Sequence, residues 1–365
     1  MSALARSRSV LAFAHRPLPA RARRVGVAVL AGAIGLLLGR LPLLTAGILL
    51  LSIVLFVLTL IDPRVGLGVA LILGPSKPLT DYFLPALPLD LGQIALIVTL
   101  GAWALHALAK RRVAVPSSPL NLPLLLFLFA AALSLLNALS LGYALKELLK
   151  WVQLLLVMWL VIDLSGQRRT GWVVAVILAA GLAQALIGIW QFGLRGDGPE
   201  HFQILGGQYY RAYGTFEQPN PYGGFIGLVL SLSVGLLLGA LGAWIAQARR
   251  CWRATRPPRL HVIARMLLRR ETIVFLMAGL VAGVLGMALV MSWSRGAWLG
   301  FGAGALAMLF AWPRRAWLGV LLVGGGLLIG AFALQYGLLP APVASRLTGF
   351  TEVFQSFDAR GADIN

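Results

Sequence analysis

The stretch LLTAGILLLSIVLFVLTLI, Leu43–Ile61, contains no charged residue. A helix rises about 1.5 Å per residue, so about 20 apolar residues cross the roughly 30 Å hydrocarbon core of a bilayer. A helix also satisfies its own backbone hydrogen bonds, which lipid cannot do. The stretch therefore predicts a transmembrane helix, and the fold depends on how often the pattern recurs.

The rest of the chain repeats this pattern. Of its 365 residues, 59% are hydrophobic and 12% are charged, and the mean hydropathy of +0.86 is too high for an ordinary soluble domain. These apolar runs predict an all-α, polytopic transmembrane helical bundle of about 11 spans. The spans are expected at Val25–Gly39, Leu43–Ile61, Val65–Gly74, Leu91–Ala109, Leu122–Ser140, Leu148–Leu164, Trp172–Phe192, Tyr222–Ala246, Thr272–Ser292, Ala297–Trp312 and Ala316–Tyr336.

Basic residues are sorted between alternate connecting segments. The net charge is +19, and most Lys and Arg residues fall in the tail 1–24, in the loop 247–271 and in the other segments on the same side. The positive-inside rule makes this side, and the N-terminus, cytoplasmic and the tail after the last span periplasmic. A loop beside anionic lipid explains the charge, so we expect membrane lipid as a partner and no nucleic acid.

The charge pattern also sets the domain organisation. A basic cytoplasmic tail, 1–24, precedes a bundle, 25–337, and residues 338–365 begin a periplasmic loop.

The third span is short and ends at GPSKP, Gly74–Pro78, which favours a broken or re-entrant helix. We retain it as a crossing, because without it the later segments change sides and the charge sorting fails.

Polar residues gather in two outer segments. The outer loop, 193–221, contains Arg211 and Asn220, and the short turn MSWSRGAW, Met291–Trp298, contains Arg295. The sequence has no nucleotide-binding motif and no metal-ligand spacing, so we expect neither a cofactor nor a metal. Arginine forks at the interface suit phosphate or pyrophosphate. The alternative for Arg295 is an interfacial anchor that only extends to the membrane surface.

The stretch YRAYGTFEQPNPYGGF, Tyr210–Phe225, enters an apolar run. Asn220 is a good N-cap and Pro221 a good first helical residue, so the sequence predicts a helix start there. Such a start favours an anion. Gly223 and Gly224 would permit close approach of a backbone or a lipid phosphate. The alternative is that Pro, Asn and Gly simply gather where any loop enters a helix.

Two stretches, RAYGTFEQPNPYGGF and further along SWSRGAWLGFGAG, together resemble the O-antigen ligase and polymerase superfamily of bacterial envelope glycosyltransferases. That family shows GTF-x-x-P-N before one membrane helix and S-R-G at the start of a later one. The resemblance implies transfer of a glycan from an undecaprenyl-pyrophosphate donor to a lipid A core, glycan or protein acceptor. The reaction would take place at the periplasmic face of the inner membrane, without a metal or nucleotide.

The resemblance also implies roles for individual residues. Arg211 and Arg295 would be catalytic and hold the departing pyrophosphate, while Tyr213, Thr215 and Asn220 would shape the substrate site. The family places a catalytic histidine in a large loop after the eleventh span, so the short segment 338–365 predicts a truncated chain. His201 lies in a different loop and is not assigned this role. A transporter of a small anion or lipid-linked sugar, and an inactive truncated family member, remain as alternatives.

Overall fold

The computed structural model describes residues 39–77, 89–111, 115–254, 269–312 and 316–338, with isolated positions 32, 35 and 344. The tail 1–24, most of the predicted span 25–39 and nearly all of segment 338–365 lie outside the described residues. The elements are α3 (Leu43–Ile61), α4 (Pro63–Leu73), η1 (Gly74–Ser76), α6 (Leu91–Ala109), α7 (Asn121–Ser134), η2 (Leu135–Asn137), α8 (Leu141–Gly193), η3 (Glu200–Phe202), β1 (Gln203–Ile204), η4 (Leu205–Gly207), β2 (Tyr209–Tyr210), α9 (Pro219–Ala254), α11 (Arg270–Met291), α12 (Arg295–Ala311) and α13 (Ala316–Gln335).

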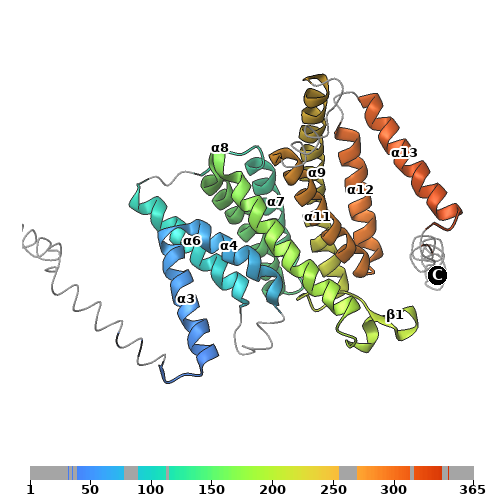
Figure 1. Ribbon diagram of the computed structural model, residues 1–365. Coiled ribbons are helices and arrows are strands. Elements are labelled where there is room, and N and C mark those ends of the chain that lie inside the picture. The colour runs from blue at the N-terminus through green and yellow to red at the C-terminus, as the bar shows by residue number, and fades with distance from the viewer. Residues whose placement is uncertain are drawn as a thin grey trace, which may run out of the picture.

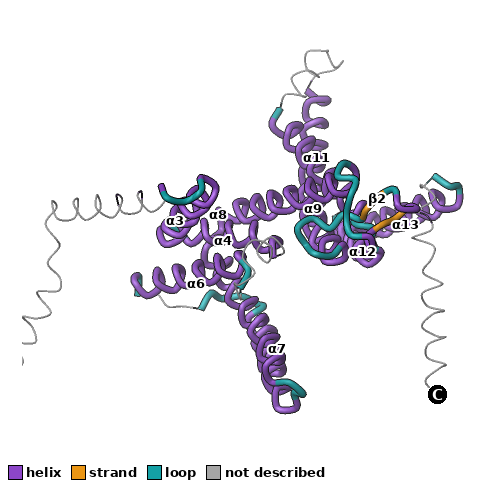
Figure 2. Tube along the Cα trace, turned by 90° about the horizontal axis from the view of Figure 1, so that it is seen from below, coloured by secondary structure: helices purple, strands orange, loops and turns teal. Residues whose placement is uncertain are grey.

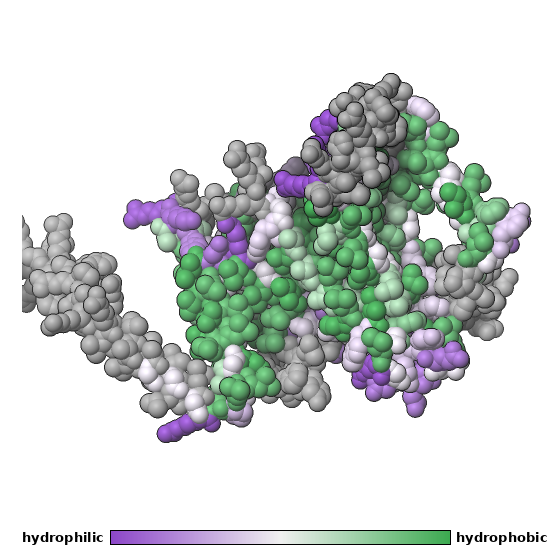
Figure 3. All heavy atoms as spheres, in the orientation of Figure 1, coloured by the Kyte–Doolittle hydropathy of each residue, from purple (hydrophilic) through white to green (hydrophobic). Residues whose placement is uncertain are grey.

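The structure is a mostly helical, membrane-type bundle (Figure 1). Within the described residues, six helical segments are long and apolar enough to cross a membrane: Leu43–Ile61, Leu91–Ala109, Thr170–Gly193, Pro219–Cys251, Arg270–Met291 and Trp317–Gln335. Two shorter apolar segments, Asn121–Asn137 and Arg295–Ala311, accompany them. In Figure 3, hydrophobic residues cover the middle of the visible face, and hydrophilic residues gather near its upper and lower margins, as expected for a protein surrounded by lipid.

Several predicted boundaries are found in the structure, and α8 differs most. Helices α3 and α6 have the bounds expected from the sequence. The structure assigns one helix of 53 residues, α8, where the sequence predicted two spans separated by a turn at residues 165–171. The helical assignment continues through the intervening residues, Ser165–Gly171, which contain no proline.

The two halves of α8 nevertheless fold back on each other, as two spans would. Gln153 in the first half lines a hollow with Gly74, and Gln184 in the second half bonds Thr215, which bonds the carbonyl of Pro75. A straight helix would place Gln153 and Gln184 about 46 Å apart.

Helix α8 connects two groups of helices (Figures 1 and 2). It packs against α4 and α6 in the first group and against α9 and α11 in the second. In the first group the backbones of α4 and α6 nearly touch, since a β-carbon on Gly92 would lie 2.7 Å from the Cα of Gly74. In the second group α9 packs against both α11 and α12. Figure 2 shows α7 extending away from these groups, while α13 contacts α12 of the second group.

The main apolar core lies where α8, α9 and α11 meet. Its buried members are Ala185, Ala212, Tyr222, Ile226, Val229, Leu230, Ala282, Leu285, Ala288 and Leu289. Ala212 belongs to the outer loop rather than to a helix, so this loop is packed into the protein where it passes the end of the bundle. The residues on either side of Ala212 are thereby placed on a rigid support.

Candidate anion-binding site

The outer loop is joined to the turn between α11 and α12. The backbone N–H of Ala212 donates to the carbonyl of Met291 at 2.9 Å, and Nε of Arg211 donates to the carbonyl of Ser292 at 3.0 Å. Both acceptors lie at the C-terminal end of α11, where carbonyl groups lack partners within the helix. The two sequence motifs, separated by some eighty residues, therefore meet at one end of the bundle.

Two glutamines of α8 hold the next part of the loop. Oε1 of Gln191 accepts hydrogen bonds from the N–H groups of Tyr213, at 3.1 Å, and Gly214, at 2.7 Å, and its Nε2 donates to the carbonyl of Gly214 at 2.8 Å. Gln184 pairs in the same way with Thr215, through its backbone N–H at 3.0 Å and its hydroxyl at 2.8 Å. These bonds satisfy backbone groups that would otherwise be buried without partners.

Gly214 is required both by its backbone and by its surroundings. Its φ of +57° lies in the left-handed region, which favours glycine. A β-carbon there would lie 2.6 Å from Oε1 of Gln184 and 2.7 Å from the ring of Tyr222. The ring of Tyr222 is fully buried, so it cannot move away easily. The conformation of the loop is therefore fixed immediately after Arg211.

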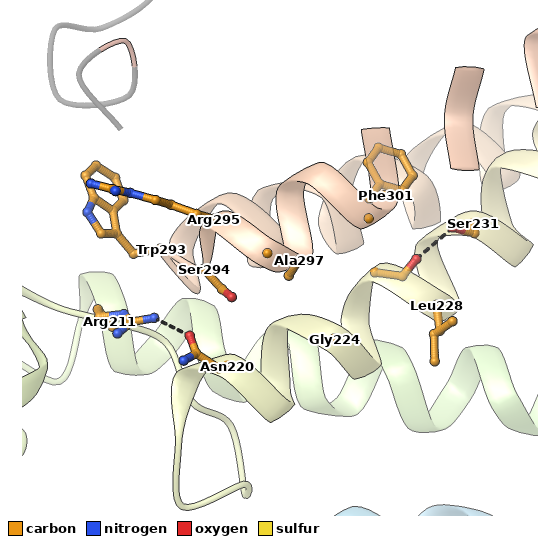
Figure 4. Close-up of a pocket in the computed structure, with 13 residues that line it drawn as sticks. Arg211, Asn220, Gly224, Leu228, Ser231, Trp293, Ser294, Arg295, Ala297 and Phe301 are labelled. Atoms are coloured by element: carbon orange, nitrogen blue, oxygen red, sulfur yellow. Dashed lines mark hydrogen bonds between the residues drawn. The ribbon is translucent and has the colours of Figure 1, made fainter. Parts of the chain in front are cut away.

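A cavity of about 790 Å³ opens between α9 and α12. Arg211, Asn220 and Arg295 line one end of it, at the starts of these two helices (Figure 4). Towards the other end the lining consists mainly of small or apolar residues. These are Gly224, Gly227, Leu228 and Ser231 on α9 and Ala297, Gly300 and Phe301 on α12. The cavity thus has a cationic head and a long, largely apolar continuation.

The start of α12 contributes to the cationic head. The turn before it places Trp293 at φ +53°, an uncommon conformation for a residue with a β-carbon. Ser294 occupies the N-cap position, but its side chain makes no capping hydrogen bond, and the residue is nearly buried and lines the cavity. Arg295 and Gly296 follow in the first turn of α12 and line the cavity as well. N–H groups at a helix start attract anions.

Asn220 does not have the predicted capping role. Helix α9 begins at Pro219, and the N–H of Tyr222 donates to the carbonyl of Gln218, so Asn220 already lies in the first turn. The prediction is wrong because Pro219 suits the first helical position as well as Pro221 does. The side chain of Asn220 instead accepts a hydrogen bond from Nη2 of Arg211 at 2.9 Å.

The two glycines of the first turn have different surroundings. A β-carbon on Gly223 would lie 2.9 Å from the hydroxyl of Ser292 and 3.0 Å from the β-carbon of Ala297, so Gly223 lets α9 approach the α11–α12 turn closely. Gly224 has no atom within 4 Å of such a position and lines the cavity. One glycine therefore serves packing between helices, and the other keeps the cavity open.

The structure brings together only some of the predicted site residues. Arg211, Arg295 and Asn220 line the same cavity. Tyr213 and Thr215 are not among its lining residues: the hydroxyl of Tyr213 accepts from Nη1 of Arg195 at 3.1 Å, and Thr215 is held by Gln184. His201 is exposed beside Phe202 and also does not line the cavity.

Sequence reasoning missed the residues that support or extend the site. Gln184 and Gln191 are polar residues seven positions apart in an apolar helix, a spacing that places both on one helix face. Their polarity at membrane depth is a signal that could have identified them. The glycine and alanine residues that line the apolar continuation of the cavity have no comparable signal, since both residue types occur throughout the predicted spans. Ser294 has no such signal either.

Comparison of the chain with protein-family models, curated proteins and solved structures finds no match. The observations that bear on function are therefore the geometry of the cavity and the motifs that line it.

Proposed function

We propose that the protein is a glycosyltransferase of the O-antigen ligase type, which takes its glycan from an undecaprenyl-pyrophosphate donor. The observation that carries the proposal is the shared cavity of Arg211, Asn220 and Arg295. Its cationic head suits a pyrophosphate, and its apolar continuation between two membrane-type helices suits a polyprenyl chain. Residues from both motifs of the family resemblance contribute to this one cavity.

The cationic head would act on the departing pyrophosphate. In the transfer, an acceptor hydroxyl oxygen bonds to the anomeric carbon of the donor. The bond between this carbon and the pyrophosphate oxygen breaks, the pyrophosphate leaves with the electron pair, and the hydroxyl proton passes to water. Negative charge therefore grows beside Arg211, Arg295 and the start of α12. Fixed cationic groups and helix N–H dipoles stabilise such charge without needing to reorganise.

The small residues of the groove would accommodate the polyprenyl chain. Gly224 and Gly300 lie on opposite sides of the groove, and a β-carbon on either would have no atom within 4 Å. Phe301 and Leu228 supply apolar surface. Burial of hydrocarbon contributes about 0.8 kcal/mol per methylene relative to water, but lipid is also apolar, so the groove would guide the chain rather than supply most of the affinity.

We further propose that the bundle has about 11 spans and lies in the bacterial inner membrane, with a cytoplasmic N-terminus. The charge sorting supports this orientation. Contacts across the outer loop agree with it, because Thr215 in that loop hydrogen-bonds the carbonyl of Pro75, just beyond the end of α4. The end of α4 and the outer loop therefore lie at the same face, as they must if α4 crosses the membrane.

The test is a deletion strain that carries the full chain with Arg211→Ala or Arg295→Ala. Each variant is expected to abolish surface glycan while the protein level stays normal. Arg211→Lys is expected to restore little, because lysine lacks the planar fork of arginine. The matched control is Arg195→Ala, which removes an arginine of the same loop that pairs with Asp197 and does not line the cavity. Normal glycan from both site variants would refute the proposal.

No described feature favours the transporter alternative. The buried polar residues in the described part of the chain are Thr, Ser and Gln, without an acidic or basic side chain among them. Charged residues inside a bundle are the usual mark of an ion or substrate pathway. The glycosyltransferase therefore remains the function that the described geometry supports best.

A further inference from the structure

A second, smaller hollow lies against the same loop. Its volume is about 190 Å³, comparable to that of one sugar ring, and it is bounded by η1 and by the residues just before α9. Its lining residues are Gly74, Pro75, Lys77, Phe216, Glu217, Gln218 and Pro221. None of these lines the larger cavity. The pyrophosphate-binding role proposed for Arg211 and Arg295 does not explain this second hollow.

Two polar side chains of the hollow, those of Glu217 and Gln218, are not used to hold the fold. Within the described residues, neither Glu217 nor Gln218 makes a side-chain hydrogen bond or ion pair. Both are exposed. By contrast, Thr215 in the same loop is bonded to Gln184 and to the carbonyl of Pro75. The loop is therefore fixed by its other residues, and the carboxylate and amide are presented on a rigid support.

The chemistry of the hollow suits a neutral sugar. A carboxylate accepts hydrogen bonds from hydroxyl groups, while a side-chain amide both donates and accepts them. Lys77 adds donors. The half-buried ring of Phe216 is braced by Tyr222 and Phe225, with ring centroids 6.1 and 5.3 Å away, and it offers an apolar face for the C–H groups of a sugar ring. An anion is a poor fit beside Glu217.

The two cavities are neighbours across one short segment of backbone. Asn220 lines the larger cavity, and the next residue, Pro221, lines the smaller one. Both cavities therefore border the start of α9. Transfer requires this arrangement, since an acceptor hydroxyl must reach the anomeric carbon that is attached to the donor pyrophosphate.

We propose that this hollow binds a neutral hexose unit of the acceptor glycan, with Glu217 and Gln218 as its main hydrogen-bonding groups. The inference rests on the proposed glycosyltransferase function and deepens it, because it assigns a separate acceptor site. The loop between the two cavities then positions donor and acceptor together: Arg211 and Asn220 act on one side, and Glu217 and Gln218 on the other.

The test measures sugar binding directly, with the full chain in lipid nanodiscs. Saturation-transfer NMR with a panel of methyl hexosides is expected to detect millimolar binding, with contact to an aromatic ring. Glu217→Gln and Gln218→Ala are each expected to weaken it roughly tenfold, since each removes a hydrogen bond or the charge that strengthens one. Glu200→Gln, at an exposed carboxylate of the same outer loop outside both cavities, is the matched control.

A second probe separates this inference from the proposed function. Geranyl pyrophosphate is expected to bind the Glu217→Gln protein as well as the wild type and to bind Arg211→Ala poorly. If the hexosides do not bind, or bind equally to the wild type and both hollow variants, the acceptor site is refuted even if geranyl pyrophosphate binds as expected. If geranyl pyrophosphate binding is insensitive to Arg211→Ala, the donor site fails instead, whatever the hexosides show.

Discussion

Nη2 of Arg211 donates to Oδ1 of Asn220 at 2.9 Å, and both residues line the larger cavity. Asn220 thus orients one of the two arginines while remaining neutral itself. Its amide oxygen supplies the hydrogen-bond acceptor without adding negative charge to a site that we propose binds a pyrophosphate. An aspartate at position 220 would instead place a negative charge beside the proposed pyrophosphate.

Asn220→Asp is expected to separate stability from anion binding. The aspartate keeps the hydrogen bond to Arg211 and suits the first turn of a helix, so the unfolding temperature should be unchanged or higher. Its charge should weaken binding of geranyl pyrophosphate at least about tenfold, because like charges a few ångströms apart repel by more than about 1.4 kcal/mol at an effective dielectric constant near 20. Isothermal titration calorimetry measures the affinity.

The control for this change is Asn220→Ala, which removes the acceptor without adding charge. It should reduce the affinity less than the aspartate does. Equal affinity of the wild-type and Asn220→Asp proteins for geranyl pyrophosphate would show that no anion binds at this end of the cavity.

Gln191→Leu is expected to destabilise the fold and release the loop. The change leaves the N–H groups of Tyr213 and Gly214 and the carbonyl of Gly214 without their partner. Each unpaired buried group costs about 1–3 kcal/mol. Thermal unfolding in detergent should therefore show a clear loss of stability. Gln203→Leu is the control, since Gln203 donates one exposed hydrogen bond to Tyr210; an equal loss in both variants would contradict the role of Gln191.

Gly214→Ala is expected to cost more than Gly196→Ala. Both glycines have positive φ, +57° and +71°, so both changes carry the roughly 1–2 kcal/mol penalty of the left-handed conformation. Only Gly214 has close neighbours, in Gln184 and Tyr222, whereas a β-carbon on Gly196 meets open space. The difference between the two unfolding free energies isolates the steric part. Similar values would mean that the loop shifts to accept the methyl group.

The helix boundaries that the sequence predicted well have local chemical causes. Asp62 accepts a hydrogen bond from the N–H of Arg64 and precedes Pro63 at the start of α4, which separates α3 from α4. Asp90 likewise caps α6 through the N–H of Gln93 at 2.7 Å. Both caps could be recognised from the sequence because their effect is confined to a few neighbouring residues.

The parts of the site that the sequence did not predict depend on contacts between distant segments. Arg211 and Arg295 were recognised as candidates, but their shared cavity results from the bonds of Arg211 and Ala212 to the end of α11. Long-range pairing of this kind has no local sequence signature. The sequence also did not predict that residues 165–171 of α8 are helical, because hydropathy alone does not distinguish a polar turn from a polar helical segment.

Gly300→Leu is expected to obstruct the apolar part of the larger cavity and leave its cationic head intact. A β-carbon on Gly300 meets no atom within 4 Å, so a larger side chain can enter the cavity without a clash, and leucine is also a better helix former than glycine. Affinity for undecaprenyl pyrophosphate should fall roughly tenfold, a cost of about 1.4 kcal/mol, because the leucine side chain blocks the path between α9 and α12 and the chain cannot follow it while the pyrophosphate stays in the cationic head. Geranyl pyrophosphate, which needs little of the groove, should bind nearly as before.

Gly283→Leu on α11 is the matched control, since Gly283 also meets open space but does not line the cavity. Both ligands are measured against the protein in nanodiscs of the same lipid, so that partitioning of the long chain into the membrane is the same for every variant. Equal binding of undecaprenyl pyrophosphate by the two leucine variants would show that the chain lies elsewhere, and the cavity would then serve the pyrophosphate alone.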